Sequence, residues 1–342
     1  MQICYLLAFP DPAETPAEKP ERIKGLKDAP YFQPVDIDVL PLATQTLHVE
    51  GVTATIVRQR YDGRVQMIEC RFDLDDPLNP ASIQHRMRIE QSLQEMLVPE
   101  ACRATGLFET YIILLVKETA FLPDTYIEQN AQDLARFIRS QREVFEENEI
   151  EDILVSRVRY SRDELTLVDW EGAVIISGVG DFQSDIELLK IGNYQLLRYR
   201  MIDQSLDDSL REINQNFKDD PHSRRRREAP TRAFLRRIIA LRLELMLEFE
   251  HTAQNLLLIG DWYTAKLYKT IQDELYLDNW RQSVKEKLTN LEEITTTIQE
   301  NFSLSWEALM EKVDIIGWLI LLVGYFVLFF MDAGWLTFNI PK

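Results

Sequence analysis

Basic side chains gather in one stretch of this acidic sequence, HSRRRREAPTRAFLRRIIALR. It holds eight arginines between Arg224 and Arg242 and a single acid, Glu228, whereas the whole chain has 38 Lys and Arg, 56 Asp and Glu and a net charge of −18. So strong a local reversal of charge favours contact with the phosphates of RNA or of anionic lipid heads. The candidate phosphate-contacting residues are Arg224, Arg225, Arg226 and Arg227, in a loop before Pro230. Pairing with the chain's own carboxylates is an equal alternative.

Elsewhere the residues that could carry catalysis or bind a metal follow no recognised spacing. The four histidines show no metal-ligand pattern, and GVGD at 178–181 lacks the lysine of a phosphate loop. Asp169 and Glu171 flank Trp170, but neighbours in a hairpin point to opposite faces or into the turn, which argues against a paired acid–base site. We therefore expect no catalytic residue, no metal ligand, no cofactor and a protein that is not an enzyme.

A long apolar run near the C-terminus is the most distinctive segment. The 17 residues from Ile315 to Met331 carry no charge, and as a helix they would span roughly 25 Å of a ~30 Å hydrocarbon core. This run predicts a transmembrane helix, with a buried core helix as the alternative. The expected anchor residues are Ile315, Trp318, Gly324, Phe330 and Trp335. Because the N-terminus lacks an export signal, we expect a single-pass protein of the bacterial inner membrane with its body in the cytoplasm.

The first two thirds of the chain alternate strand and helix patterns, which predicts an α+β body over residues 1–220. Asp62-Gly63 lies between two β-rich runs and predicts a hairpin. Asn79 can cap a helix that begins at Pro80 and ends before Pro99. Three further β-rich stretches, at 153–160, 164–177 and 194–203, predict strands, with a fold-back at 170–172.

The last third predicts helices at 231–259, 261–276 and from Asn279 onward. Apolar residues of the last helix are separated by three and four residues alternately, with one extra four-residue step after Phe302, which indicates a coiled-coil seam. The seam residues are Val284, Leu288, Leu291, Thr295, Ile298, Phe302, Trp306, Leu309, Val313, Ile316, Ile320, Val323, Val327 and Phe330. Antiparallel packing of the N-terminal half of this helix against the helix at 231–259, which carries Phe234, Ile238, Leu241 and Leu245, is favoured. The expected divisions are 221–312 for the Arg-rich loop and helical hairpin, and 313–342 for the anchor.

The segment LLIGDWYTAKLYKTIQDELYLDNWRQSVKEKL, followed by a helix into an apolar run, resembles the required-for-meiotic-nuclear-division family, also called YagE or Sif-type proteins. The matching positions are Asp261-Trp262-Tyr263, Leu267-Tyr268, Leu277, Arg281 and Lys287-Leu288. The resemblance covers about residues 255 to 331. It implies an anchor or scaffold that holds the translation machinery near a membrane, without established catalytic residues.

Together these patterns favour a membrane-anchored binding or scaffold protein that tethers a polyanionic partner. The expected partners are the lipid bilayer, a further copy of the chain at the seam, and an RNA-containing particle or anionic lipid at the arginines. A CorA-like oligomeric ion transporter is the first alternative, although the Gly-Met-Asn signature of that family is absent. A membrane-surface enzyme is the second.

Overall fold

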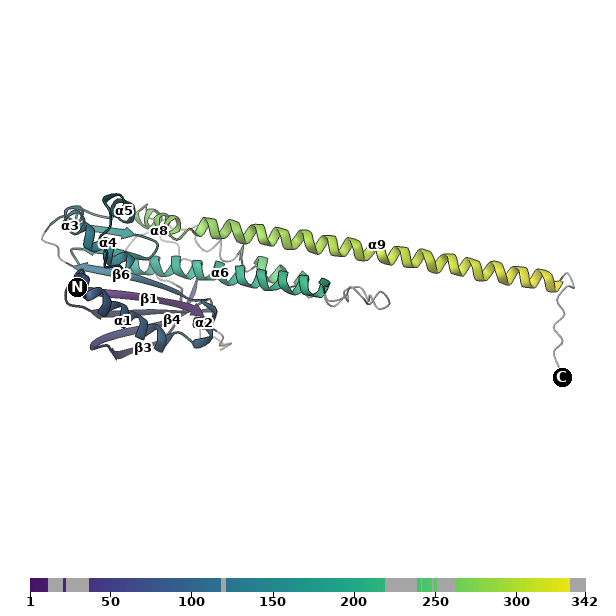
Figure 1. Cartoon of the computed structure of the whole chain (residues 1–342), viewed down its shortest axis with the longest axis horizontal. Coiled ribbons are helices and arrows are strands. Elements are labelled where there is room, and N and C mark those ends of the chain that lie inside the picture. The colour runs from purple at the N-terminus through teal and green to yellow at the C-terminus, as the bar shows by residue number, and fades with distance from the viewer. Residues whose placement is uncertain are drawn as a thin grey trace. The chain divides into compact units, whose positions relative to one another are not determined.

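The computed structural model describes residues 1–11, 21–22, 37–117, 121–218, 239–240, 242–247, 249–250 and 262–332 (Figure 1). Its strands are β1 (Gln2–Pro10), β2 (Glu21–Arg22), β3 (Asp38–Val49), β4 (Val52–Tyr61), β5 (Val65–Asp73), β6 (Glu109–Lys117), β7 (Arg157–Arg159), β8 (Glu164–Val168) and β9 (Gly172–Ser177). Its helices are α1 (Pro80–Leu97), α2 (Glu100–Thr105), α3 (Pro123–Gln129), α4 (Ala131–Arg139), α5 (Glu147–Ile153), α6 (Gln183–Lys218), α8 (Trp262–Glu274) and α9 (Leu277–Asp332). The predicted mixed α+β body followed by helices is confirmed.

The strands form one sheet in the order β2-β3-β4-β5-β1-β6-β9-β8-β7. All neighbouring pairs are antiparallel except β6 and β9, which run parallel. The predicted hairpin between β4 and β5 is confirmed. Asp62 and Gly63 adopt φ of 47° and 65°, and the Arg64 N–H donates to the Tyr61 carbonyl oxygen at 3.0 Å, which closes the turn between the paired residues Tyr61 and Val65. The predicted start of α1 is also confirmed, because the Asn79 side chain accepts a hydrogen bond from the Ala81 N–H at 2.9 Å.

Helices cover both faces of the sheet. The apolar side chains of β1 alternate between the faces, and Ile3, Leu7 and Phe9 join the core formed with α1, α3, α4 and α5. On the opposite face, α6 contacts β4 and β5 through Lys190, and α8 contacts β8 through Tyr263. Figure 1 shows α1 and the N-terminal part of α6 on opposite sides of the sheet. Residues between these layers are therefore held from two sides.

The strand predicted over 194–203 is wrong, because these residues lie in the middle of α6. Buried side chains recur there at helical spacing. They include Ile186, Leu189, Lys190, Asn193, Tyr194, Leu197, Arg198 and Ile202. The β-branched and aromatic content of this stretch suggested a strand, but its period of three and four residues identifies the helix. Upstream, α3 and α4 are two separate helices that meet at Asn130, and α4 ends at Ser140 in the left-handed conformation.

The predicted transmembrane anchor is wrong. The part of the chain that the structure describes contains no helix that is long and apolar enough to cross a membrane. The uncharged run of 17 residues from Ile315 to Met331 lies in α9 and is followed by Asp332, the last residue of that helix. A helix of that length is roughly 25 Å long, short of the ~30 Å hydrocarbon core. The prediction of a single-pass protein of the bacterial inner membrane, which depended on this anchor, is corrected with it.

The chain divides into two units. The first comprises residues 1–208 and 245–287, and the second residues 209–244 and 288–342. In the first unit lie all the strands named above and helices α1 to α5 and α8. In the second unit, Arg242 forms an ion pair with Glu292 in α9 at 2.8 Å. The predicted boundaries at 220/221 and 312/313 stay predictions.

Candidate functional site

A notch in the sheet of the first unit forms the candidate site. The strand β6 pairs with β1 from Glu109 onward, but β9 begins only at Gly172, opposite Ile112. From Glu109 to Tyr111, β6 therefore has a strand neighbour on one side alone. A β-carbon built on Gly172 would lie 2.7 Å from the side chain and 2.8 Å from the carbonyl oxygen of Ile112. Glycine thus permits the close approach at which β9 starts and the notch ends.

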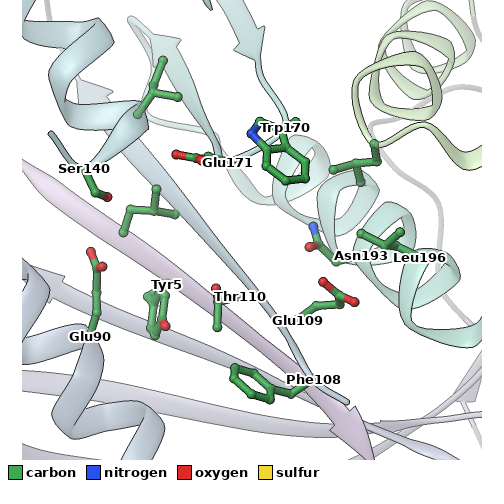
Figure 2. Close-up of a pocket in the computed structure, with 13 residues that line it drawn as sticks. Tyr5, Glu90, Phe108, Glu109, Thr110, Ser140, Trp170, Glu171, Asn193 and Leu196 are labelled. Atoms are coloured by element: carbon green, nitrogen blue, oxygen red, sulfur yellow. The ribbon is translucent and has the colours of Figure 1, made fainter. Parts of the chain in front are cut away.

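A cavity of about 360 Å³ lies at this notch. Its lining residues come from both layers of helices, from the sheet and from the turn between β8 and β9 (Figure 2). They are Tyr5, Glu90, Phe108, Glu109, Thr110, Ile112, Ile138, Ser140, Trp170, Glu171, Asn193, Leu196 and Leu275. Three of them are carboxylates, and none of the lining residues that the structure describes is a lysine, arginine or histidine. The volume lies at the small end of the range for ligand pockets, about 300 to 1,000 Å³.

Each cavity carboxylate is held by an arginine that lies outside the lining. Arg86 contacts Glu90 at 2.9 Å, Arg200 contacts Glu109, and Arg139 contacts Glu171 at 3.8 Å. In each pair the carboxylate atom is Oε1. Arg200 also donates a hydrogen bond to Glu109, whereas the contacts of Glu90 and Glu171 are ion pairs alone. No hydrogen bond among the described residues involves Oε2 of any of the three, and a carboxylate can accept hydrogen bonds on both oxygens.

The buried Arg86 connects two walls of the cavity. Its guanidinium donates to the carbonyl oxygen of Phe137 at 2.7 Å and to Oγ of Ser140 at 2.5 Å, and it lies 4.3 Å from the centroid of the Phe137 ring. These contacts join α1 to the C-terminal end of α4. Because Arg86 is completely buried, a charge there is stable only with such partners. Glu90 is therefore fixed by the core as well as by its own helix.

The turn that carries Trp170 and Glu171 is fixed by Asp169 and Arg139. Arg139, the last residue of α4, contacts Asp169 at 3.0 Å and Glu171 at 3.8 Å. The Tyr111 hydroxyl donates to the Asp169 carbonyl oxygen at 2.7 Å. These bonds hold the Asp169 side chain away from solvent and leave the Trp170 indole 53% exposed. The turn thus presents an indole and a carboxylate to the cavity on a rigid support.

Burial shifts the acidity of the cavity carboxyls. Burial raises the pKa of Glu90 and of Glu109 above the ordinary value, against the lowering effect of Arg86 and Arg200 respectively. Burial also raises the pKa of Asp169 to about 6, although the Glu171 backbone N–H and Arg139 oppose the shift. A charged carboxylate in this cavity is therefore less stable than one in water. A cation in the cavity would offset that loss.

The residues singled out from the sequence lie elsewhere or are not described. Arg224, Arg225, Arg226 and Arg227 lie outside the described residues, as does Trp335. Ile315 and Trp318 are exposed on α9, and a β-carbon added to Gly324 would meet no atom within 4 Å. Phe330 lies in α9, but its side chain is not described.

The cavity was missed at the level of sequence, although one signal for it was present. Trp170 lies between two acids in a tight turn, a position in which the sequence argues against a paired acid–base site. The structure brings Trp170 and Glu171 together with Glu90 and Glu109, from α1 and the start of β6. These residues are up to 81 positions apart in the chain. Motif spacing along one sequence cannot show that residues so far apart in the chain line the same cavity.

Comparison with known proteins places the family signal in the N-terminal half. The family model "Uncharacterized protein MJ0711, N-terminal domain" matches residues 11–182. The chain is 24% identical over 225 residues to the uncharacterized protein MJ0711 of Methanocaldococcus jannaschii, a match that covers 64% of this chain and 68% of that protein. No solved structure matches the chain. Membership of the meiotic-nuclear-division family, inferred from the C-terminal helices, is therefore wrong. The matched region includes nine of the thirteen cavity-lining residues.

Proposed function

The chain belongs to the MJ0711 N-terminal domain family, and we propose that its α+β body is a binding module that takes a small organic cation into the notch cavity. The observation that carries this proposal is the composition of the cavity wall, which combines three carboxylates and aromatic side chains without a basic residue. Such a wall favours a positively charged group with apolar parts.

The carboxylates supply the charge complementarity. Each is bound to an arginine through Oε1, and a carboxylate has acceptor sites on both oxygens. An ammonium or guanidinium in the cavity can therefore donate to Oε2 while the structural ion pairs persist. Hydrogen bonds to charged groups contribute about 1.5 to 3 kcal/mol. One such bond to Glu109 is enough to distinguish a charged ligand from a neutral one.

The shape of the cavity favours an organic cation over a metal ion. Figure 2 shows Glu90 and Tyr5 at one side, Glu109 beside Asn193, and Glu171 next to Trp170. Carboxylates on separate walls cannot all coordinate one ion, and the described residues contain no group of three His, Cys, Asp or Glu side chains that could hold a metal. An extended amine can reach two of these walls at once. The Trp170 and Phe108 rings add cation–π attraction.

This proposal keeps the class of function favoured by the sequence, a binding module, and changes the expected ligand. The arginine loop and its polyanionic partner stay a separate prediction, because residues 224–227 are not among those described. The transporter and membrane-surface enzyme alternatives gain no supporting observation from the cavity.

A thermal-shift screen with paired compounds tests the proposal. Each pair joins an amine to a neutral compound of the same shape, for example 1,4-diaminobutane with 1,4-butanediol and 1,5-diaminopentane with 1,5-pentanediol. Binding to the folded state raises the midpoint of unfolding. We expect stabilisation by at least one amine and none by its neutral partner.

Variants locate the binding. Glu109→Gln removes a cavity charge, and Arg200 stays satisfied by the carbonyl oxygens of Phe108 and Gly106 at 3.1 and 2.7 Å. Glu128→Gln, on the exposed surface of α3, is the matched control. The amine response should fall about tenfold or more in the first variant and persist in the second. A response that is equal in both variants, or equal for amine and neutral compound, would refute the proposal.

A further inference from the structure

The C-terminal part of α9 carries an apolar seam without a partner among the described residues. Val313, Ile316, Ile320, Val323 and Val327 follow each other at intervals of three, four, three and four residues. Their exposed fractions range from 42 to 65%. We call these five residues the distal seam. Aliphatic surface of this extent in water requires a cover.

The distal seam continues a seam that is covered earlier in the same helix. Leu291 and Thr295 occupy equivalent positions of the repeat and are buried at 0 and 3% exposure. The repeat then runs through α9 without a proline as far as Val327, with the one extra four-residue step after Phe302. A sustained alternation of three and four residues is the pattern of a helix that packs lengthwise against other helices. The distal seam thus has the sequence of a packed surface.

From this seam we infer that the chain assembles into a parallel homo-oligomer of three or more copies through the distal part of α9. The alternating intervals make Val313, Ile320 and Val327 one kind of core position and Ile316 and Val323 the other. All five side chains are β-branched. In parallel coiled coils, β-branched residues at both core positions favour three or more strands over two.

The surface beside the seam supports the same assembly size. Gly317 and Gly324 each follow a seam residue directly, and a β-carbon added to either would meet no atom within 4 Å. Small residues there let neighbouring helices approach closely. Leu319 and Phe326, each preceding a seam residue directly, are also at least 50% exposed. In a two-helix assembly, most of the surface beside the seam, including Leu319 and Phe326, would stay in water. In an assembly of three or more helices, each helix has two neighbours, which cover a wider part of its circumference.

The oligomeric state of the full-length chain tests the inference. In mild detergent, light scattering after size exclusion should give a mass of three or more copies for the parent protein. Ile320→Asp places a charge in the centre of the seam and should weaken assembly at least tenfold. The variant should therefore stay monomeric even at a protein concentration ten times the lowest one at which the parent protein is assembled. Because Ile320 is 65% exposed, the substitution does not disturb the folding of one copy. Tyr325→Asp, outside the seam, is the control and should stay assembled.

Single cysteines test the orientation, in a Cys102→Ser background that leaves the buried Cys4 and Cys70. Val313→Cys and Val327→Cys should each form a disulfide between copies, because identical core positions meet all along a parallel arrangement but at one level alone of an antiparallel one. Tyr325→Cys should not. A monomeric parent protein would overturn the inference, and if that monomer bound liposomes, lipid would be the cover instead. Equal assembly of parent and Ile320→Asp, or cross-linking at Tyr325 alone, would overturn it as well.

Discussion

Replacement of Lys190 by methionine tests the account of how α6 is held on the sheet. The Lys190 side chain is 1% exposed, and its ammonium contacts Glu69 on β5 and, at 2.8 Å, Glu187 on α6. It also lies 3.3 Å from Oε1 of Gln59 on β4. Lys190→Met keeps most of the side-chain volume and removes the charge. Two buried or half-buried carboxylates then lose their shared cation.

The expected loss of stability follows from the burial of this group. Removing one partner of a buried ion pair destabilises by about 3–5 kcal/mol. Because Arg71 still contacts Glu69 at 2.5 Å, we expect the lower end, about 3 kcal/mol. At roughly 2–4 °C per kcal/mol, the unfolding midpoint should fall by about 6–12 °C. Lys269→Met removes an exposed pair with Asp273 and should change stability by no more than about 1 kcal/mol.

The loss should also depend on pH. Burial alone would raise the pKa of Glu69, but Lys190 and Arg71 outweigh it and hold that pKa below its ordinary value of 4.5. Burial alone would lower the pKa of Lys190, but Glu187 and Glu69 raise it above its ordinary value of 10.5. The network therefore stabilises fully between about pH 4.5 and 10.5. It weakens as pH falls through the lowered pKa of Glu69 or rises through the raised pKa of Lys190.

In Lys190→Met, burial raises the pKa of Glu69 relative to the parent protein. The variant's carboxylates then take up protons at a higher pH than those of the parent, so the difference in unfolding free energy should shrink from pH 7 to pH 5. Chemical denaturation of parent and both variants at these two pH values measures it. An equal loss for Lys190→Met and Lys269→Met, or a difference that does not change with pH, would refute the reasoning.

Three further predictions follow from single features. Gly172→Ala places a β-carbon 2.8 Å from the Ile112 carbonyl oxygen and should destabilise by about 1–3 kcal/mol in chemical denaturation, whereas Gly178→Ala, with its nearest atom at 3.5 Å, should change little; equal effects would contradict the close approach. The Asp169 carboxyl should titrate near pH 6 by carbon NMR, and Arg139→Gln should raise that pKa further; a pKa below 4 would contradict its burial. Neutralising 224–227 should weaken co-sedimentation with RNA-containing particles and flatten its salt dependence, and unchanged binding curves would exclude phosphate contacts.

Short sequence patterns correctly predicted a hairpin turn and a helix start, because contacts between residues close in the chain determine them. The hairpin at Asp62-Gly63 and the cap at Asn79 depend on backbone conformation and on one side-chain hydrogen bond, and both were readable from the residue types. The strand predicted at 194–203 failed because β-branched and aromatic residues also fill a helix packed against a sheet. There the spacing of the buried residues, and not their type, decides the structure.

The cavity and the anchor show two different limits of the sequence. Glu90, Glu109 and Glu171 line one cavity because β9 pairs with β6 only from Ile112, three residues after the pairing with β1 begins, a register that no single segment encodes. The apolar run from Ile315 to Met331 suggests a membrane span by its composition, but its length is at the lower limit for one. The spacing of its apolar residues, at intervals of three and four, instead indicates a helix that packs against other helices. The length of the run and the spacing within it therefore lead to different expectations for the same residues, a membrane span and a coiled-coil seam.

Isothermal titration of the best amine from the paired screen into the full-length protein tests the central claim most directly. The claim predicts one site per chain, an affinity that rises with pH as Glu90 and Glu109 lose their protons, and release of protons on binding, since burial raises the pKa of both carboxyls. It also predicts at least a tenfold weaker affinity for Glu109→Gln. Absence of binding at any pH, or an affinity that is the same for parent and Glu109→Gln, would contradict the assignment of the cavity to an organic cation.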